Sequence, residues 1–308
     1  MATRRRRSVF RRIIHPSDFS RASRPAFRKA LGLARDGRAQ LTIMHVLPVL
    51  PMLPDIYVAA TTYNELLQGQ RVAAQKELDR LVREAKAAGI RTQGLLVDVG
   101  VAAERITRLA KSRRADLIVM GTHGRTGVRR ALMGSVAARV LTMAPCPVLT
   151  VSRMRGRDRG AAMIRRILSA SDFSPASRPA FAKAVDLARA TRAELTVAHV
   201  LTPPLPVLID GSMSPQAWRA MNTAARRDGQ RQLEGLVSRA KRAGVRARAL
   251  LLEGVAAERI VRAATSRHAD MIVMGTHGRT GFARLLAGSV ANRVISQARC
   301  PVLTVPGR

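Results

Sequence analysis

The chain is a tandem duplication, and this feature constrains its fold more than any other. Ser17-Asp18-Phe19-Ser20 returns as Ser171-Asp172-Phe173-Ser174, an offset of 154 residues from Asp18 to Asp172. The stretch 100–106 returns at the same offset as 254–260, so the copies have nearly equal length. Each copy has the size of an ordinary domain and is too long for a solenoid repeat. We therefore expect two domains of one fold, over residues 8–152 and 163–306, joined by a linker rich in Arg and Gly.

One copy shows strand patterns and helix patterns in alternation. Short apolar or β-branched runs predict strands at 12–15, 41–46, 95–97, 117–120 and 147–151. Helical periodicity predicts helices from a cap at Ser20 or Ser23 through residue 34, then at 65–88, 101–111 and 136–143, with Gly89 ending the second. The segment 47–61 contains several prolines and is expected to be a loop. The alternation predicts an α/β fold, a doubly wound parallel sheet with helices on both faces. Ligands of such folds bind at the carboxyl ends of the strands.

A glycine-rich loop follows the fourth predicted strand and carries the clearest chemical signal. Gly121 and Gly124 follow the strand, Arg125 lies in the loop, and Gly134-Ser135 opens the last helix. Glycine lets backbone amides approach a phosphate closely, and a helix start supplies unpaired N–H groups. Ser135 can cap the helix or donate to a phosphate oxygen. The second copy repeats the pattern at Gly275, Gly278, Arg279, Gly288 and Ser289.

Other phosphate-binding motifs do not occur in the sequence. It contains no Walker-A lysine motif, and the turn after the first strand has no G-x-G-x-x-G. A glycine-rich surface loop without a ligand is the alternative interpretation. Two copies at the same spacing, each between an apolar strand and a helix, favour binding of an anionic nucleotide.

With these motifs the sequence resembles a tandem universal stress protein of the ATP-binding type. The resemblance rests on Asp18, on His45-Val46, on the loop from Gly121 to Ser135, on Cys146-Pro147-Val148, and on their second copies. It implies a five-stranded parallel sheet of order 3-2-1-4-5 in each domain. It also implies ATP, accompanied by Mg²⁺, with Asp18 and Val46 near the adenosine and the glycine loop on the phosphates. It further implies that the two domains pair as an internal pseudo-dimer. Whether two chains also form a homodimer stays open at this point.

The candidate nucleotide-binding residues follow from this resemblance. In the first copy they are Pro16, Asp18, Val46, Met120, Gly121, Gly124, Arg125, Gly134, Ser135 and Val136. In the second copy they are Ala170, Asp172, Val200, Met274, Gly275, Gly278, Arg279, Gly288, Ser289 and Val290. The change from His15-Pro16 to Ser169-Ala170 lies beside the aspartate, so the two sites are expected to differ in affinity.

The expected function is that of a nucleotide-dependent binding and signalling module in the stress response. No loop residue is an obvious general base and no carboxylate pair flanks the loop, so we expect no catalytic residue and at most slow ATP hydrolysis. We also expect no protein-bound metal site. Glu104 and Glu258 are expected to serve the dipole of a short helix, His45 and His199 to be half-buried with a partner, and Cys146 and Cys300 to be buried.

The charge leaves a second kind of partner open. Basic residues number 54 and acidic ones 20, a formal charge of +34, and the basic residues are mostly arginine. Such a charge attracts nucleic acid, but the arginines are spread over every predicted helix, which favours a composition bias. No apolar run reaches the length of a membrane span, and no long apolar stretch follows the basic start. We therefore expect a cytoplasmic protein without membrane contact.

Overall fold

The computed structural model describes residues 9–48, 60–124, 133–152, 164–202, 214–276 and 288–307. By its internal contacts the chain divides into two compact units, Met1–Ala162 and Met163–Arg308. Each unit is an α/β domain, which confirms the predicted fold class and the presence of two domains.

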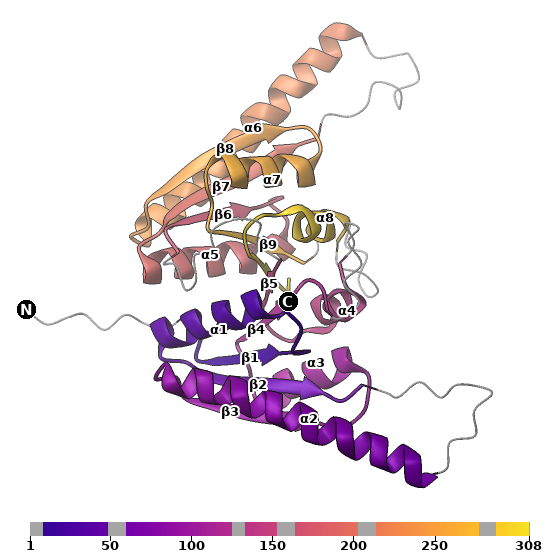
Figure 1. The fold of residues 1–308 in the computed structure, drawn as a ribbon. Helices are drawn as coiled ribbons and strands as arrows, with labels where there is room; N and C mark the ends of the chain where they lie inside the picture. Colours follow the sequence, from indigo (N-terminus) through magenta and orange to yellow (C-terminus); the bar gives the residue numbers. More distant parts are fainter. Residues whose placement is uncertain are drawn as a thin grey trace, which may run out of the picture. The chain divides into compact units, whose positions relative to one another are not determined.

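Unit 1 alternates strands and helices along the chain (Figure 1). Its elements are β1 (Arg12–Pro16), α1 (Arg24–Gly37), β2 (Gln40–Val46), α2 (Ala60–Ala87), β3 (Thr92–Val97), α3 (Ala102–Ser112), β4 (Leu117–Gly121), α4 (Ser135–Met143) and β5 (Val148–Val151).

Unit 2 repeats this order, with a short 3-10 turn, η1 (Pro175–Ser177), before its first α-helix. Its other elements are β6 (Arg166–Ala170), α5 (Arg178–Thr191), β7 (Glu194–Leu201), α6 (Pro215–Arg242), β8 (Ala247–Glu253), α7 (Ala256–Ser266), β9 (Met271–Gly275), α8 (Ser289–Gln297) and β10 (Val302–Val305).

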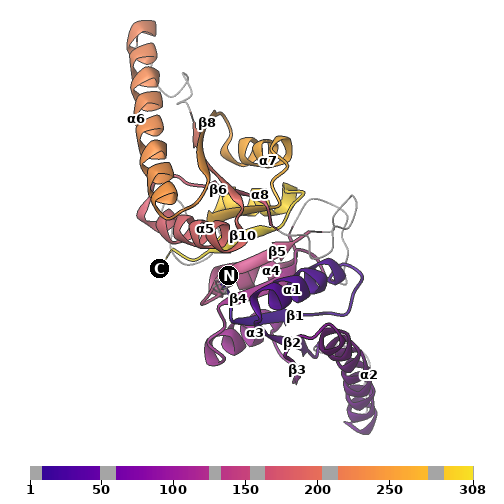
Figure 2. The ribbon, with the colours of Figure 1, turned by 90° about the vertical axis from the view of Figure 1, so that its left-hand side faces the viewer.

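All strand pairs within each unit are parallel. In unit 1 they join in the order β3-β2-β1-β4-β5, and in unit 2 in the order β8-β7-β6-β9-β10. Right-handed crossovers in such an order place the first two helices on one face and the last two on the other. Figure 2 shows this arrangement: α1 and α2 lie opposite α3 and α4, and α5 and α6 lie opposite α7 and α8. The carboxyl ends of β1 and β4, which point to the same edge, are therefore neighbours.

The central strands form the core because both of their faces are covered. The first four residues of β4, Leu117 to Met120, are buried, and so is the run Ile13 to His15 of β1. The outer strand β3 is only half-buried and begins at Thr92, which pairs with Leu41. The predicted start at Leu95 was too late, because an edge strand is held by backbone pairing and lacks a continuous apolar run.

The helix ends show which local sequence signals predicted a boundary correctly. Gly89 adopts a φ of 74° and its amide bonds to the carbonyl of Lys86, so it ends α2 as predicted. The start of α2 lies at Ala60, five residues before the predicted start at Glu65, so the loop prediction through residue 61 was slightly too long. Glu104 and Glu258 lie in the first turns of α3 and α7, as expected.

The predicted capping role of Ser23 was wrong. Ser23 occupies the position before α1, but its side chain does not cap the helix. Its hydroxyl donates instead to the carbonyl of Ser20 at 2.9 Å. The hydroxyl is thus committed to the turn that precedes the helix, a local bond that competes with capping.

Among the described helices, none combines the length and the apolar character needed to cross a bilayer.

Candidate functional site

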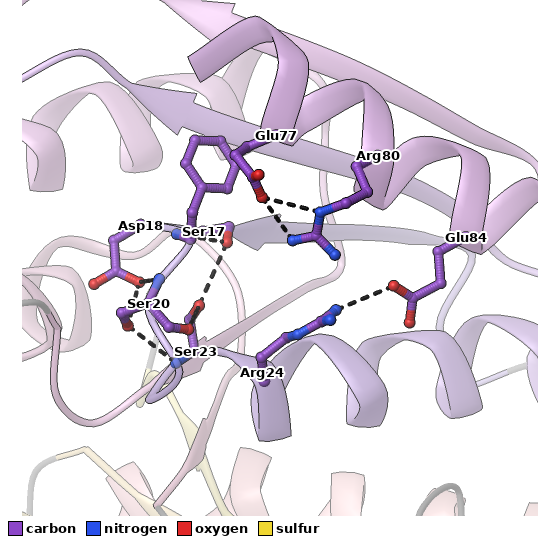
Figure 3. Close-up of polar contacts among 9 residues, drawn as sticks. Ser17, Asp18, Ser20, Ser23, Arg24, Glu77, Arg80 and Glu84 are labelled. Atoms are coloured by element: carbon purple, nitrogen blue, oxygen red, sulfur yellow. Dashed lines mark hydrogen bonds and ion pairs between the residues drawn. The ribbon is translucent and has the colours of Figure 1, made fainter. Parts of the chain in front are cut away.

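The turn after β1 is built from its own short polar side chains (Figure 3). Asp18 accepts two hydrogen bonds at Oδ1, from the amide of Ser20 at 3.1 Å and from its hydroxyl at 2.7 Å. Ser17 Oγ accepts from the amide of Phe19 at 3.2 Å. These bonds hold Phe19 at a φ of 62°, a left-handed conformation that is uncommon for a bulky residue. The turn therefore fixes the carboxylate of Asp18 at the carboxyl edge of the sheet.

The described glycines of the loop after β4 lie against this turn and against their own backbone. A Cβ on Gly124 would lie 3.0 Å from Asp18 Oδ2, so the aspartate of the turn after β1 and the glycine of the loop after β4 meet. A Cβ on Gly121 would lie 3.2 Å from the carbonyl of His123, and one on Gly134 would lie 3.2 Å from the carbonyl of Thr122. Each of these approaches is tighter than an alanine side chain tolerates easily. The glycines thus bring the backbone close to Asp18.

The helix α4 begins beside this arrangement of the Asp18 turn and the glycines, which we call the cradle, and it has no side-chain cap. Gly134 is the N-cap residue, in an extended conformation, and its amide donates to the carbonyl of Thr122 at 2.8 Å. Ser135 is the first helical residue and does not cap the helix, which corrects one of its two predicted roles. Capping belongs to the residue before the first turn, and the helix starts one residue earlier than predicted. The amides of the first turn carry the positive end of the helix dipole.

The end of β2 is fixed to the same turn by a histidine. His45 is buried, and its Nδ1 donates to the carbonyl of Ser17 at 2.7 Å. Its ring stacks on Phe19 with the ring centroids 4.3 Å apart. The prediction of a histidine with a partner is confirmed, although the side chain is buried and not half-buried. Val46, which follows it, lies half-buried and pairs with Val97.

The second copy reproduces the turn. Asp172 Oδ1 accepts from the amide of Ser174 at 3.0 Å and from its hydroxyl at 2.6 Å. His199 donates to the carbonyl of Ser171 at 2.7 Å and packs on Phe173 at 4.1 Å between centroids. Gly288 is the N-cap residue of α8, and its amide donates to the carbonyl of Thr276 at 2.8 Å, so Ser289 does not cap that helix either.

The two units differ at the end of their first strand. His15 is fully buried in unit 1, and its Nδ1 donates to the carbonyl of Val119 at 2.8 Å. Burial lowers the pKa of His15 to about 4, against the opposing influence of the Val119 carbonyl and of the Asp18 carboxylate. Unit 2 has the buried Ser169 at this position. One unit therefore carries a titratable group under its turn and the other does not.

The predicted site residues fall into three groups. Those at the carboxyl edge of the described strands and at the helix starts are Pro16, Asp18, Val46, Gly121, Gly124, Gly134, Ser135 and Val136, and in unit 2 Ala170, Asp172, Val200, Gly275, Gly288, Ser289 and Val290. Met120 and Met274 are buried in β4 and β9, next to the last residue of each strand. Arg125, Gly278 and Arg279 lie outside the described residues.

Sequence reasoning missed the residues that hold the site together. Ser17, Phe19 and Ser20 shape the turn, and only Asp18 was singled out. The repetition of Ser-Asp-Phe-Ser in both copies was the available signal. Cys146 is buried as predicted, and burial, together with the Asp116 carboxylate, raises the pKa of its thiol to about 12. Cys300 is only partly buried.

Among the described residues, no cluster of three or more His, Cys, Asp or Glu side chains could hold a metal ion.

These features define a class of protein: two α/β domains of one design, each with a parallel sheet and an aspartate turn at its carboxyl edge, which in unit 1 faces a glycine bend. Comparison with known proteins narrows the class. The universal stress protein family matches residues 10–152 and again residues 163–306. The chain belongs to the universal stress protein family and carries two of its domains.

Individual relatives agree with this assignment. A universal stress protein of Mycolicibacterium smegmatis is 30% identical over 305 residues, which cover 94% of this chain and 95% of the relative. One from Methanocaldococcus jannaschii is 36% identical over 148 residues, 47% of this chain and 84% of the relative. The crystal structure of a universal stress protein from Archaeoglobus fulgidus covers 97% of both chains with a TM-score of 0.68 at 19% identity, which shows a shared fold.

Proposed function

We propose that each domain binds an adenine nucleotide, ATP accompanied by Mg²⁺, and that the chain is a nucleotide-dependent binding and signalling module of the stress response. The observation that carries the proposal is the start of α4. Its N-cap is a glycine without a side-chain cap, and this helix start lies beside the glycine bend that faces Asp18. In unit 2, Gly288 is likewise the N-cap residue of α8, without a side-chain cap.

The residues fit a nucleoside triphosphate in chemical terms. Backbone amides at a helix start favour phosphate oxygens, and the helix dipole favours negative charge. The Asp18 carboxylate can accept hydrogen bonds from ribose hydroxyls. Val136 and Val290, in the first turns of α4 and α8, are 38% and 36% exposed and offer an apolar surface to the organic part of a ligand. Magnesium would offset the repulsion between phosphates and Asp18, and the phosphates would supply part of its oxygen ligands.

The described residues around the cradle support binding more than catalysis. Asp18 uses Oδ1 in its own turn, and His15 is buried beneath the strand. His123 shares a hydrogen bond of 2.9 Å with Thr122. We therefore propose that any ATP hydrolysis is slow and that it sets the lifetime of a conformational state. The internal pseudo-dimer, a further homodimer and a cytoplasmic location stay predictions.

The test begins with the protein purified without added ligand. Denaturation followed by mass analysis identifies any nucleotide that it carries. Calorimetric titration with ATP, AMP and other purine nucleotides in magnesium then counts the sites. Gly134→Ala and Gly288→Ala each place a Cβ at the helix start and are expected to remove one site by weakening it about tenfold or more.

A matched control is Gly69→Ala in α2, where a Cβ would meet nothing within 4 Å. This variant should bind as the unmodified chain does. Phosphate release that Gly134→Ala abolishes would assign slow ATPase activity. Absence of heat from every purine nucleotide in a protein that carries none would refute the proposal.

Association with nucleic acid is the alternative that the charge of +34 leaves open. Duplex binding with a steep salt dependence, unchanged in the Gly134→Ala and Gly288→Ala variants, would favour it.

A further inference from the structure

Unit 2 contains a groove between α5 and α6, with a volume of about 720 Å³. One end of the groove reaches the turn after β6, at Ser171 and Phe173. In unit 1 the aspartate of the corresponding turn, Asp18, points away from the space between the two helices (Figure 3). The lining of the groove contains neither Asp172 nor Gly288, so the groove and the proposed nucleotide site share no more than this turn.

Three arginines from two helices line this groove. Arg178 begins α5, and Arg239 and Arg242 lie in the last turns of α6. The guanidinium carbon of Arg239 lies 5.8 Å from the ring centroid of Phe181, a distance typical of a cation–π contact. Asp186 is the one carboxylate in the lining. Three positive charges against one negative charge make the groove a surface that favours anions.

Unit 1 shows what the same helices do when the charges are balanced. The helices α2 and α6 each have 28 residues, so Glu84 of α2 corresponds to Arg239 of α6. Glu84 forms an ion pair with Arg24, with 3.1 Å between Arg24 Nη1 and Glu84 Oε2. Arg24 corresponds to Arg178 of unit 2. In unit 2 the carboxylate of that pair is replaced by a third guanidinium. Figure 3 shows the paired arrangement of unit 1.

The same comparison shows how the wall of the unit 2 groove differs from the corresponding surface of unit 1. Arg80 of α2, which forms an ion pair with Glu77 at 2.6 Å, corresponds to Gly235 of α6. Glu77 itself corresponds to Gln232, an uncharged side chain in the lining. A long side chain and its carboxylate partner are thus exchanged for a glycine and an amide. The change removes both bulk and negative charge from the wall.

We infer that this groove of unit 2 binds an oligophosphate, a ligand with two or more linked phosphate groups. A guanidinium presents a planar fork of donors that matches phosphate oxygens, and three such groups from two sides suit more than one phosphate. The volume lies in the range of small-molecule sites. Phe173 and Leu236 supply an apolar wall, so the phosphates can belong to an inorganic chain or to a nucleotide.

The test uses the full chain with Gly134→Ala and Gly288→Ala, so that the proposed nucleotide sites do not contribute. Inorganic tripolyphosphate and a nucleoside triphosphate are titrated separately by calorimetry, without magnesium, and the comparison decides between the two sources. Changing Arg178, Arg239 and Arg242 to Gln should weaken tripolyphosphate binding about tenfold or more. Circular dichroism melting checks that each variant is folded.

The matched control removes three other exposed arginines of unit 2 that do not line the groove, Arg189, Arg219 and Arg262, also as Gln variants. This control variant has the same net charge as the groove variant. It should bind tripolyphosphate with nearly the affinity of the chain with intact arginines. A sharper variant is Arg239→Glu, which restores the carboxylate of unit 1. This glutamate should pair with Arg178 and abolish binding through a single substitution.

Three results would overturn the inference. The first is no tripolyphosphate binding by the chain with intact arginines. The second is an equal weakening of tripolyphosphate binding in the groove variant and in the control variant. That result would show that binding depends only on the net positive charge of the chain. The third is a loss of duplex DNA binding in the groove variant with tripolyphosphate binding unchanged, which would assign the arginines to nucleic acid. None of these results depends on whether the glycine bends bind ATP.

Discussion

The buried His15 of unit 1 makes the stability of that unit dependent on pH. Burial lowers its pKa from 6.5 to about 4 in the folded state, while an unfolded chain keeps the ordinary value. As the pH falls below 6.5, the unfolded state binds a proton and the folded state does not, so folding becomes less favourable. The loss grows until about pH 4, where the folded state is protonated as well. At still lower pH this group adds no further change.

The magnitude follows from the two pKa values. The full difference corresponds to about 3 kcal/mol, because one pKa unit is about 1.4 kcal/mol. Between pH 7 and pH 5 the expected loss is about 2 kcal/mol, most of the full effect. Unit 2, with Ser169 at the equivalent position, lacks this contribution.

Peptide-resolved hydrogen exchange in urea measures the two units separately in the same chain. The protection of β1 reports on unit 1, and that of β6 serves as an internal reference. His15→Asn is the informative variant, because an amide still offers an N–H to the Val119 carbonyl and does not titrate in this range. The unmodified chain should lose about 2 kcal/mol more in unit 1 than the variant does between pH 7 and pH 5.

Any packing defect of the variant is present at both pH values and cancels in the difference. Two results would refute the reasoning. One is an identical pH dependence of unit 1 in both proteins. The other is a titration of the His15 ring in the folded protein, followed by NMR, with a midpoint near 6.5.

Three further predictions concern unit 1. Cys146 should resist alkylation by iodoacetamide at pH 9 in the folded protein, because burial raises the pKa of its thiol to about 12, and intact-mass analysis checks this. Rapid labelling without unfolding would contradict it. Asp116→Ala should destabilise unit 1 by about 1–3 kcal/mol, because the carboxylate accepts from two backbone amides at the start of β1, at 2.7 and 3.1 Å. Urea unfolding measures the change, and an unchanged midpoint would argue against it. Glu84→Gln should cost less than about 1 kcal/mol, because its ion pair with Arg24 is 42% exposed on both sides. A larger loss in the same assay would show that the pair is more than a surface contact.

Much of the fold could be predicted because its signals are local or periodic. The duplication is visible by inspection, and the alternation of apolar runs with amphipathic segments predicted an α/β fold with two domains. Gly89 ended α2 as predicted, because this position has a positive φ, which glycine adopts more easily than other residues. The prediction was weakest at the edge strand β3 and at the start of α2, where backbone pairing and helix propagation extend an element beyond its apolar residues.

The chemistry of particular side chains was decided only by the tertiary structure. The sequence does not show that Asp18 commits one oxygen to Ser20 while the other lies against Gly124, far along the chain. Nor does it show that Arg178 and Arg239 line one groove, since they belong to different helices. Pairing, burial and pKa depend on neighbours brought close by folding, whereas strands and helices depend mainly on residues close in sequence. The sequence by itself therefore determined the repeated architecture, and the packing of distant segments determined what each polar group is able to bind.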